Sequence, residues 1–270
     1  MQEEATTLGA VDVLTPRTLE EALRLKSETP GAFPIQGGTD VMVELKFDRA
    51  RPPALLNLNE VAELRGWAGT NGRVSLGAGL TYAEAMEHPL AELLPALAEA
   101  ARTVGGPQIR NRGTVGGNLG TASPAGDALP PLLVAGAEVN VASVRGERTL
   151  PLHEFLVGPK RNALAEDELI VGVSVEAGAG ETFLKVGPRN AMVIAVVSLA
   201  LRVVDGELRA AFGSAGPVPA LVRAPLEEAS SFPEQVAAAA SPIDDVRGTA
   251  AYRRHALRIL AGRALDRCLA

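Results

Sequence analysis

Residues 109–139 read IRNRGTVGGNLGTASPAGDALPPLLVAGAEV, and a second glycine-rich segment, PIQGGTD, occupies residues 34–40. Each segment contains two adjacent glycines close to a threonine. Backbone N–H groups are uncovered at such glycines, so a loop of this kind can wrap a diphosphate without any positive side chain. We therefore expect a side chain at Gly37 or Gly116 to fill space that a diphosphate needs. One glycine pair alone is typical of a plain tight turn, but the two together favour a dinucleotide held by two loops.

The segment SPAGD at 123–127 follows the second glycine pair and supplies two further polar groups. Ser123 and Asp127 are suited to anchoring a ribose or the edge of a ring. Because Ser and Asp are also common at helix starts, capping of a helix is the alternative interpretation.

Sequence signatures of other cofactor sites and of hydrolases are incomplete or missing. No Walker A sequence occurs, and GAGLTY at 77–82 has Tyr82 in place of the third glycine of a Rossmann fingerprint. HEFLV at 153–157 lacks the second histidine of a zincin helix, and FGSAG at 212–216 has the wrong spacing for a nucleophile elbow. We expect the 3 histidines to be structural or on the surface, and we assign no catalytic residue and no metal ligand.

The composition argues against several further kinds of partner and site. The 270 residues carry 26 Lys+Arg against 32 Asp+Glu, and this acidic balance argues against nucleic acid as a partner. Cys268 is the only cysteine, which excludes an internal disulfide, a multi-cysteine zinc site and an iron–sulfur cluster built from this chain alone. No stretch approaches the roughly 20 apolar residues of a membrane span. The first residues, MQEEATTLG, carry acids where a secretory signal carries bases, so we expect a cytoplasmic protein.

The pattern of apolar residues predicts strands and helices in three successive groups. In the first group, Val11 to Leu14 forms a strand, Thr18 and Glu21 begin a helix as a capping box, and residues 32–36 form a second strand. The second group has short strands, alanine-rich helices and a long glycine-rich loop, which ends in the apolar, helix-like run LPPLLVAGAEV and for which we expect a function. We place these strands at 54–58, 73–79, 138–143 and 168–175, the helices at 90–103 and the loop at 104–131.

The third group begins with long β-type runs at 181–186, 192–204 and 207–216. We expect three neighbouring strands of an antiparallel sheet, with Asp205 and Gly206 in a tight hairpin turn.

The third group ends in an amphipathic helix over residues 249–269. The basic segment YRR at 252–254 could dock this helix or a partner chain, and a solvated basic face is the alternative. The three groups predict domains at 1–53, 54–176 and 177–270.

Taken together, the chain resembles the FAD-binding medium subunits of the molybdenum hydroxylases, which include the flavoprotein subunits of carbon monoxide dehydrogenase and xanthine dehydrogenase. The segments that carry the resemblance are PIQGGTDVMVELK at 34–46, IRNRGTVGGNLGTASPAGDALPPLLVAGAEV at 109–139, FLVGPKRNALAEDELIVGV at 155–173, FLKVGPRNAMVIAVV at 183–197 and YRRHALRILAGRAL at 252–265. The resemblance implies an α+β fold. Two subdomains form an FAD-binding module of the vanillyl-alcohol-oxidase (PCMH-like) type, and a C-terminal domain with an antiparallel sheet and helices follows.

The resemblance also implies the residues that hold FAD, which would lie between the first two subdomains without a covalent bond. The first phosphate loop would consist of Ile35, Gln36, Gly37, Gly38, Thr39 and Asp40. The second would consist of Thr114, Val115, Gly116, Gly117 and Asn118. Asp127 is implied as a polar anchor, and Ile170 and Lys185 match positions that line the flavin. Val104 falls where some relatives carry an aromatic residue beside the flavin.

Lys185 also has a physical rationale. A cation near the pyrimidine end of a flavin stabilises the negative charge that builds up on reduction and raises the flavin potential. The alternative for Lys185 is a surface lysine on a strand, held in an ion pair.

The resemblance implies an oxidoreductase subunit that works with other chains. A large subunit would carry the molybdenum cofactor and a small subunit would carry [2Fe–2S] clusters, in a dimer of heterotrimers. Electrons would pass from the clusters through FAD to an external acceptor. The alternatives are a stand-alone flavin oxidase of the vanillyl-alcohol-oxidase type, a relative of the NADPH-dependent cell-wall reductases, and an assembly protein that has lost its flavin. Neither glycine loop contains His or Cys, the usual points of covalent FAD attachment.

Overall fold

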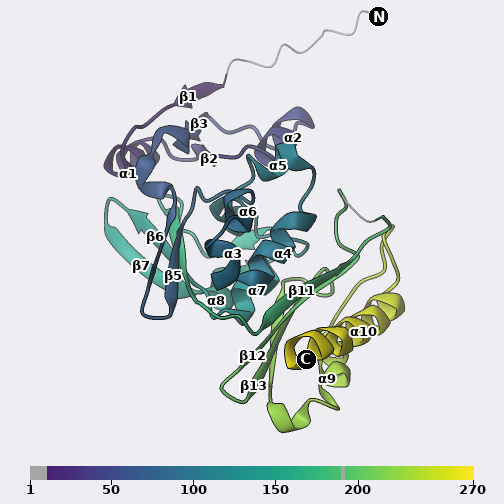
Figure 1. The fold of residues 1–270 in the computed structure, drawn as a ribbon. Coiled ribbons are helices and arrows are strands. Elements are labelled where there is room, and N and C mark those ends of the chain that lie inside the picture. Colours follow the sequence, from purple (N-terminus) through teal and green to yellow (C-terminus); the bar gives the residue numbers. More distant parts are fainter. Residues whose placement is uncertain (1–10, 190–191) are drawn as a thin grey trace, which may run out of the picture.

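The computed structural model describes residues 11–189 and 192–270 (Figure 1). The segment MQEEATTLG, on which the expectation about a secretory signal depends, lies outside the described residues, as do two residues of FLKVGPRNAMVIAVV. Figure 1 shows a small N-terminal sheet, a central sheet covered by helices, and a C-terminal sheet with two helices on its far side.

The N-terminal part is a parallel three-stranded sheet with two helices. Its elements are β1 (Asp12–Leu14), α1 (Leu19–Glu28), β2 (Phe33–Ile35), α2 (Val41–Lys46) and β3 (Ala54–Asn57). The Thr18 hydroxyl accepts a hydrogen bond from the Glu21 N–H at 3.1 Å, so the predicted cap of α1 is confirmed.

The position of β3 corrects one expectation. The strand order is β1-β3-β2, so β3 lies between the other two strands and pairs with both. From its sequence, this strand was expected in the central group. The expected boundary after residue 53 would separate β3 from its hydrogen-bonded neighbours, so the first sheet extends to Asn57. The three-part division itself stays a prediction.

The central part is an antiparallel five-stranded sheet with helices on one face. The strand order is β4-β5-β10-β6-β7. Its strands are β4 (Trp67–Thr70), β5 (Arg73–Gly77), β6 (Glu138–Ser143), β7 (Gly146–Pro151) and β10 (Leu169–Glu176), with the short pair β8 (Leu156–Gly158) and β9 (Arg161–Asn162) beside it. Its helices are α3 (Leu90–Leu93), α4 (Pro95–Thr103), α5 (Pro107–Arg110), α6 (Val115–Thr121), α7 (Leu129–Val134) and α8 (Leu152–Phe155), with single 3-10 turns at Leu58–Glu60, Ala62–Leu64 and Glu84–Met86.

The long loop expected at 104–131 is wrong as a description of most of this segment, because α5 and α6 lie within it. The helix-like run expected at its end is confirmed as α7. Prolines in the first turns of α5 and α7 and the Thr114 cap of α6 begin these helices. Each helix has only four to seven residues, too short to form alone in water. Burial of apolar residues stabilises α6 and α7, whereas α5 has no buried residue.

The C-terminal part is an antiparallel sheet in the order β11-β12-β13-β14. Its elements are β11 (Glu181–Val186), β12 (Val197–Val204), β13 (Glu207–Gly213), β14 (Ala220–Pro225), a 3-10 turn at Leu226–Glu228, α9 (Phe232–Ala239) and α10 (Ala250–Leu269). Asp205 and Gly206 both have positive φ, 49° and 74°, between the paired ends of β12 and β13. The predicted hairpin is confirmed.

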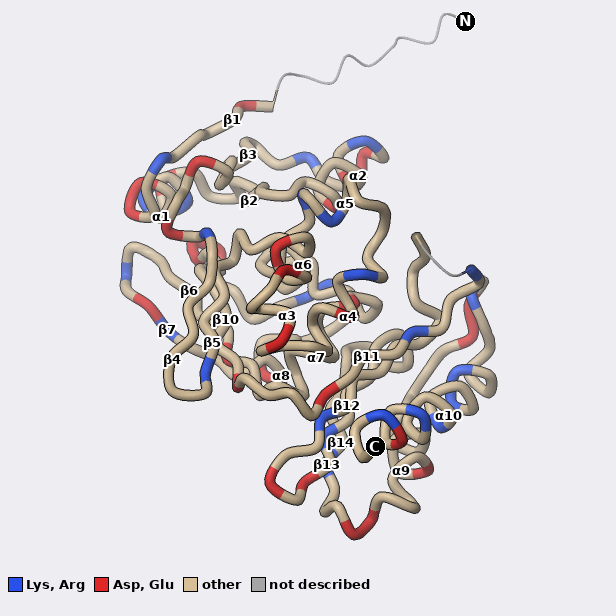
Figure 2. Tube along the Cα trace, viewed as in Figure 1, with Lys and Arg blue, Asp and Glu red and all other residues tan. Residues whose placement is uncertain are grey.

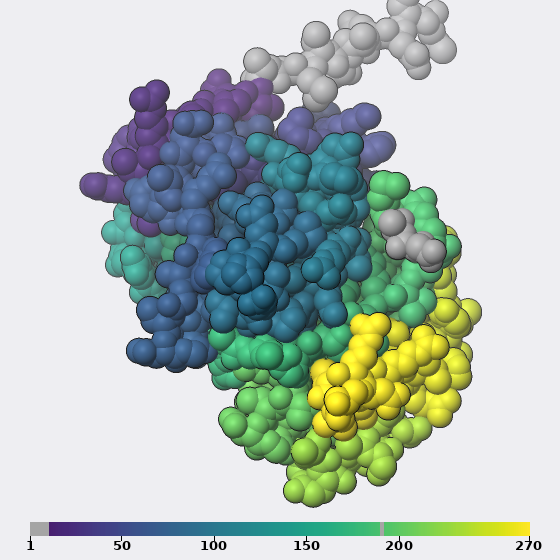
Figure 3. Space-filling view, viewed as in Figure 1, coloured from purple at the N-terminus to yellow at the C-terminus, as the bar shows by residue number. Residues whose placement is uncertain are grey.

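Successive side chains of β12 point to opposite faces of the sheet, and the two faces pack in different hydrophobic cores. Leu199 and Leu201 pack under α9 and α10, whereas Ala200 belongs to the core that continues into the central part. Helices α4 and α7 lie between the central and C-terminal sheets (Figure 1), and the space-filling view shows the two parts packed closely together (Figure 3). The inner face of the C-terminal sheet is thereby brought against the segment that carries Asp127.

Candidate functional site

The two glycine-rich segments lie in direct contact although they are far apart in the sequence. A Cβ atom added at Gly37 would overlap the backbone carbonyl of Arg112. The Arg112 guanidinium donates to the Gln36 carbonyl at 3.1 Å and to the Asn59 side chain at 3.3 Å. The structure therefore brings together the two loops that the sequence analysis singled out.

The first loop presents unused backbone donors. The N–H groups of Gly37, Gly38, Thr39 and Asp40 donate no hydrogen bond to any described residue. Gly38 has φ of +75°, a conformation that L side chains rarely adopt, and it lets the chain turn sharply into α2. Successive free N–H groups in a turn make a concave site for an anion, as a diphosphate requires.

The second loop differs from the expectation, because the N–H groups of four of its five residues already donate hydrogen bonds within the protein. The Thr114 hydroxyl accepts from the Gly117 N–H at 2.9 Å and so caps α6. The Val115 and Gly116 N–H groups donate to the carbonyls of Leu80 and Ala78, at 2.9 and 2.8 Å. In the second loop only the Thr114 N–H has no partner among the described residues, so the run of free backbone donors is in the first loop.

The glycine pairs also have a different role from the one expected. A Cβ at Gly116 would lie 2.6 Å from the Cβ and the carbonyl oxygen of Ala78, and a Cβ at Gly37 would meet Arg112. In both cases the space is filled by protein. Gly37 and Gly116 permit close packing of the loops, and the expectation that their side chains would occupy diphosphate space was wrong.

Helix α6 instead offers a face without side chains. Gly117 and Gly120 are exposed, and a Cβ at Gly120 would meet only the Ile170 side chain, at 3.7 Å. The Thr121 hydroxyl at the end of this helix donates to Asp40 at 3.0 Å, which ties α6 to the first loop. Because no side chain stands in the way at these glycines, a flat ligand could lie directly against the helix backbone.

Three buried polar atoms of the candidate residues have no hydrogen-bond partner among the described residues. They are Gln36 Nε2, Asn118 Oδ1 and Asp127 Oδ1. Buried polar groups are normally paired, so an unpaired donor and two unpaired acceptors mark a place where a ligand or water completes the structure. FAD carries phosphates, hydroxyls and a ring edge with both donors and acceptors, and it fits this set chemically.

Lys185 and Asp127 form a buried ion pair. Lys185 Nζ lies 2.6 Å from Asp127 Oδ2, and the two side chains are 6% and 9% exposed. The ammonium also lies 3.3 Å from the Thr103 carbonyl and 3.5 Å from its hydroxyl. Burial raises the pKa of Asp127, and the charge and hydrogen bond of Lys185 oppose this shift. The alternative of a surface lysine is wrong, because this ammonium is buried.

The remaining candidates adjoin this pair. Asp127 does not cap α7, since that helix has no side-chain cap. The Ser123 hydroxyl accepts from the Ala125 N–H at 3.3 Å and stabilises the turn that leads to Asp127. Val104 follows Thr103 at the end of α4 and is half-buried.

Sequence reasoning missed three residues that organise the site. Arg112 bridges the two loops, Thr121 ties α6 to Asp40, and Thr103 contacts Lys185. Arg112 stands inside the RGTVGGN segment, so its place beside the glycines was a usable signal. Nothing in the sequence distinguishes Thr103 or Thr121 from other threonines.

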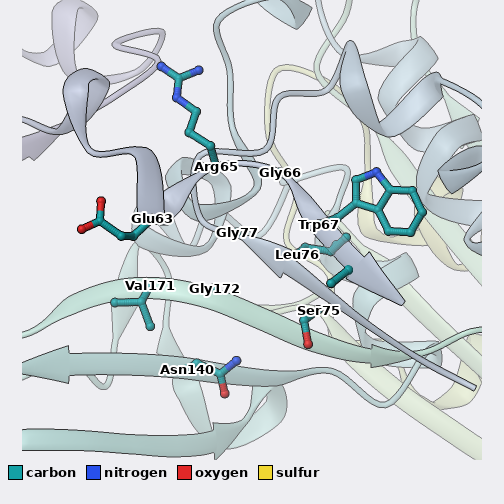
Figure 4. A pocket seen from close by; sticks show the side chains of 11 residues that line it. Glu63, Arg65, Gly66, Trp67, Ser75, Leu76, Gly77, Asn140, Val171 and Gly172 are labelled. Carbon is teal, nitrogen blue, oxygen red and sulfur yellow. The ribbon is translucent and has the colours of Figure 1, made fainter. Parts of the chain in front are cut away.

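A separate pocket of about 330 Å³ lies on the central sheet and contains none of the candidate residues (Figure 4). Val171 lines it, whereas the neighbouring Ile170 side chain lies against α6, so the pocket is on the other face of the sheet. Figure 4 shows that the side chains of Arg65 and Trp67 point away from each other. The pocket has no convergent polar groups and is not the site described above.

Within 11–189 and 192–270, no helix has the length and apolar character needed to cross a membrane. The side chains of His88 and His153 are largely exposed, and His255 is also on the surface, as expected for the histidines.

Comparison with known proteins agrees with the geometry. The family model described as "FAD binding domain in molybdopterin dehydrogenase" matches residues 9–175. The chain is 30% identical over 274 residues to the xanthine dehydrogenase FAD-binding subunit of Escherichia coli O157:H7, covering 94% of each chain. It is 31% identical over 276 residues to the nicotine 6-hydroxylase medium subunit of Paenarthrobacter nicotinovorans, covering 96% of this chain and 97% of that one.

Solved structures show the same similarity. A chain of carbon monoxide dehydrogenase from Hydrogenophaga pseudoflava matches with a TM-score of 0.86 and 26% identity, over 95% of this chain and 96% of that one. A chain of quinoline 2-oxidoreductase from Pseudomonas putida 86 matches in fold, with a TM-score of 0.89 and 24% identity, over 97% and 98%. The expected α+β architecture is confirmed. By its sequence match, this chain belongs to the family of FAD-binding domains of molybdopterin dehydrogenases.

Proposed function

We propose that this chain is the electron-transfer flavoprotein subunit of a molybdenum-containing hydroxylase complex. FAD, when bound, supplies a carrier that accepts electrons and releases them to an external acceptor. In this proposal a large subunit carries the molybdenum cofactor and selects the substrate, and a small subunit carries [2Fe–2S] clusters. The complex is a dimer of such heterotrimers.

The observation that carries the proposal is the first loop, with four successive free N–H groups from Gly37 to Asp40. We assign these groups to the diphosphate. The second loop positions the first through Arg112, and the bare face of α6 at Gly117 and Gly120 admits the cofactor.

The unpaired atoms of Gln36, Asn118 and Asp127 would complete their hydrogen bonding with the cofactor. Ile35, Val104 and Ile170 supply apolar contacts to the cofactor. Ser123 stabilises the turn before Asp127 through its hydrogen bond with the Ala125 N–H. Lys185 and Asp127 place a cation and its counter-ion beside the flavin. The role of these residues is to bind the cofactor, to exclude water from one side of it and to set its potential.

Spectroscopy of the purified chain tests this proposal directly. We expect yellow protein whose flavin is released as free FAD by acid, since neither loop contains His or Cys. A colourless chain that cannot be reconstituted with FAD contradicts the proposal.

The strongest alternative is a stand-alone flavin oxidase of the vanillyl-alcohol-oxidase type. Such an enzyme reduces its flavin with an alcohol or phenol substrate in the absence of any other chain. The proposal instead expects no reduction of bound FAD by organic substrates alone, and rapid reduction when the proposed molybdenum and iron–sulfur subunits and their substrate are added.

A further inference from the structure

Arg253 is a buried arginine in the first turn of α10. It is 3% exposed, whereas Arg254 and Arg258 on the same helix are exposed. Figure 2 marks several basic positions along α10. Its Nη1 donates to the Ser214 carbonyl at 2.6 Å, and its Nη2 pairs with Asp245 at 2.5 Å. Loss of either partner would leave the buried guanidinium without compensation, which is strongly destabilising. Arg253 therefore holds Ser214 and Asp245 in fixed positions.

Ser214 connects Arg253 to the candidate cofactor site. It follows β13 directly and has φ of +60°, and its N–H donates to the Pro124 carbonyl at 2.7 Å. Pro124 lies in the turn that begins at Ser123, where the Gly126 N–H donates to the Ser123 carbonyl at 2.9 Å. This turn leads directly into Asp127.

The sheet register brings the same segment against Lys185. Lys185 on β11 is opposite Ser198 on β12, and Ser198 is opposite Gly213 on β13. Residues opposite one another in antiparallel strands share a face, so this row points at the turn that carries Asp127. A Cβ at Gly213 would lie 3.2 Å from the Pro124 carbonyl oxygen, which shows how closely the row and the turn approach.

We propose that Arg253 is a positioning residue for the cofactor site. It fixes the Ser214 peptide, Ser214 holds Pro124, and the turn after Pro124 places Asp127 opposite Lys185. The terminal helix therefore controls the geometry of an ion pair on the far side of the C-terminal sheet. This proposal rests on the proposed function, in which Asp127 and Lys185 flank the flavin.

The first experiment uses the full chain without FAD, so it does not depend on the proposed function. In Arg253→Met, the Ser214 amide and the amides of residues 125–127 should exchange with solvent at least about tenfold faster than in the parent, by hydrogen exchange. Arg258→Met is the matched control, because that exposed arginine pairs only with Glu234 among the described residues, and it should change nothing there. Unchanged exchange at these amides in Arg253→Met overturns the proposal.

The second experiment measures the FAD dissociation constant in a double-mutant cycle. Arg253→Met should weaken FAD binding about tenfold in the parent and have little further effect in an Asp127→Asn background, because it acts through Asp127. Equal losses in both backgrounds indicate a merely structural role and reject the proposal. If the parent chain binds no FAD at all, the proposed function fails, while the exchange experiment still decides the positioning role.

Two milder variants keep the test decisive if Arg253→Met does not fold. Arg253→Lys retains the charge and one hydrogen bond, so exchange and FAD affinity should lie between those of the parent and the methionine variant. Asp245→Asn removes the negative charge that pairs with both Arg253 and Arg247, and it leaves the Arg253 hydrogen bond to Ser214 possible. It should also make the Ser214 amide exchange faster. Parent-like values in both folded variants contradict the proposal.

Discussion

Lys185 Nζ lies 2.6 Å from Asp127 Oδ2, and this ion pair joins the C-terminal sheet to the turn before α7. Both charges are removed from solvent, and the second oxygen of Asp127 has no described partner. The pair is therefore both a link between two parts of the fold and an incomplete polar site. Each property gives a separate prediction.

The first prediction concerns stability without FAD. Lys185→Met or Asp127→Asn alone leaves a buried charge without its counter-ion and should lower the free energy of unfolding by about 3–5 kcal/mol. The double variant should lose less than the sum of the two, because no unpaired charge stays behind. Chemical denaturation of the four proteins measures this coupling, and strict additivity would contradict it.

The second prediction concerns the flavin potential. Lys185→Gln removes a cation that stabilises negative charge on the reduced flavin, so the midpoint potential should become more negative. Asp127→Asn removes the counter-ion and should make it more positive. Lys160→Gln is the control, because Lys160 pairs with Glu44 on the surface. Redox titration of the FAD-loaded chain would refute the assignment if both site variants shifted in the same direction.

The third prediction compares two glycines, one at which a side chain would clash with neighbouring backbone and one in a helix at which it would meet nothing. Gly37→Ala pushes a methyl group into the Arg112 carbonyl, so it should cost about 1–3 kcal/mol of stability and weaken FAD binding by moving the loops apart. Gly262→Ala meets no atom within 4 Å on α10 and should stabilise the chain by up to about 1 kcal/mol. Thermal unfolding and FAD titration measure both effects. Parent-like FAD affinity in Gly37→Ala would show that loop contact is not needed.

Local signals in the sequence were sufficient for much of this fold. The Thr18 cap and the Asp205–Gly206 hairpin were predicted because each depends on residues within a few positions of one another. Three of the four strands of the C-terminal sheet were predicted for the same reason, since their apolar runs are long, whereas β14 (Ala220–Pro225) was not predicted.

Features that depend on distant contacts could not be predicted in this way. Nothing within β3 indicates that it inserts between β1 and β2, because parallel pairing is decided by strands elsewhere in the chain. The short helix α6 was hidden by its glycines, which disfavour helices in isolation but permit close packing on Ala78. Ser123 and Asp127 were singled out as polar residues of SPAGD, whereas Val104, Ile170 and Lys185 came from the family resemblance, and only the fold shows that Lys185 reaches Asp127.

The fourth prediction is a pH dependence from Glu181 on β11. Its side chain is 1% exposed, and burial raises its pKa to about 7, although Arg202 and the Ala96 N–H act in the opposite direction. The folded chain therefore holds this proton more tightly than the unfolded chain, whose carboxyl has its ordinary pKa. The free energy of unfolding should fall as the pH rises from about 4.5 to about 7, by on the order of 3 kcal/mol from this group.

Glu181→Gln should abolish this contribution. The free energy of unfolding of the variant minus that of the parent should be larger at about pH 8 than at about pH 4.5, because glutamine has no charge to bury. Glu227→Gln, at an exposed position, is the control. Denaturant titrations across this range measure the difference, and parallel curves for parent and Glu181→Gln would count against the buried charge.

The fifth prediction concerns the thiol of Cys268. Burial, with smaller contributions from Glu181 and Glu99, raises its pKa from 9.0 to about 11. The thiolate fraction at about pH 8 is then about 100-fold lower than for an ordinary thiol, so alkylation should be correspondingly slow. The chain unfolded in urea should react at the ordinary rate. Equal rates for native and unfolded protein would rule out a buried, protonated thiol.

The contact between Arg112 and Gln36 spans 76 residues, and this has a consequence for how the protein is made. During synthesis the first loop leaves the ribosome well before the segment that supports it, and contacts between such distant segments form late. The contact that holds the first loop against the second can therefore form only after the chain has been made at least as far as Arg112. Under the proposed function, the flavin is inserted after the central part has folded, so scarcity of FAD in a cell should yield folded, colourless chains that can still be loaded.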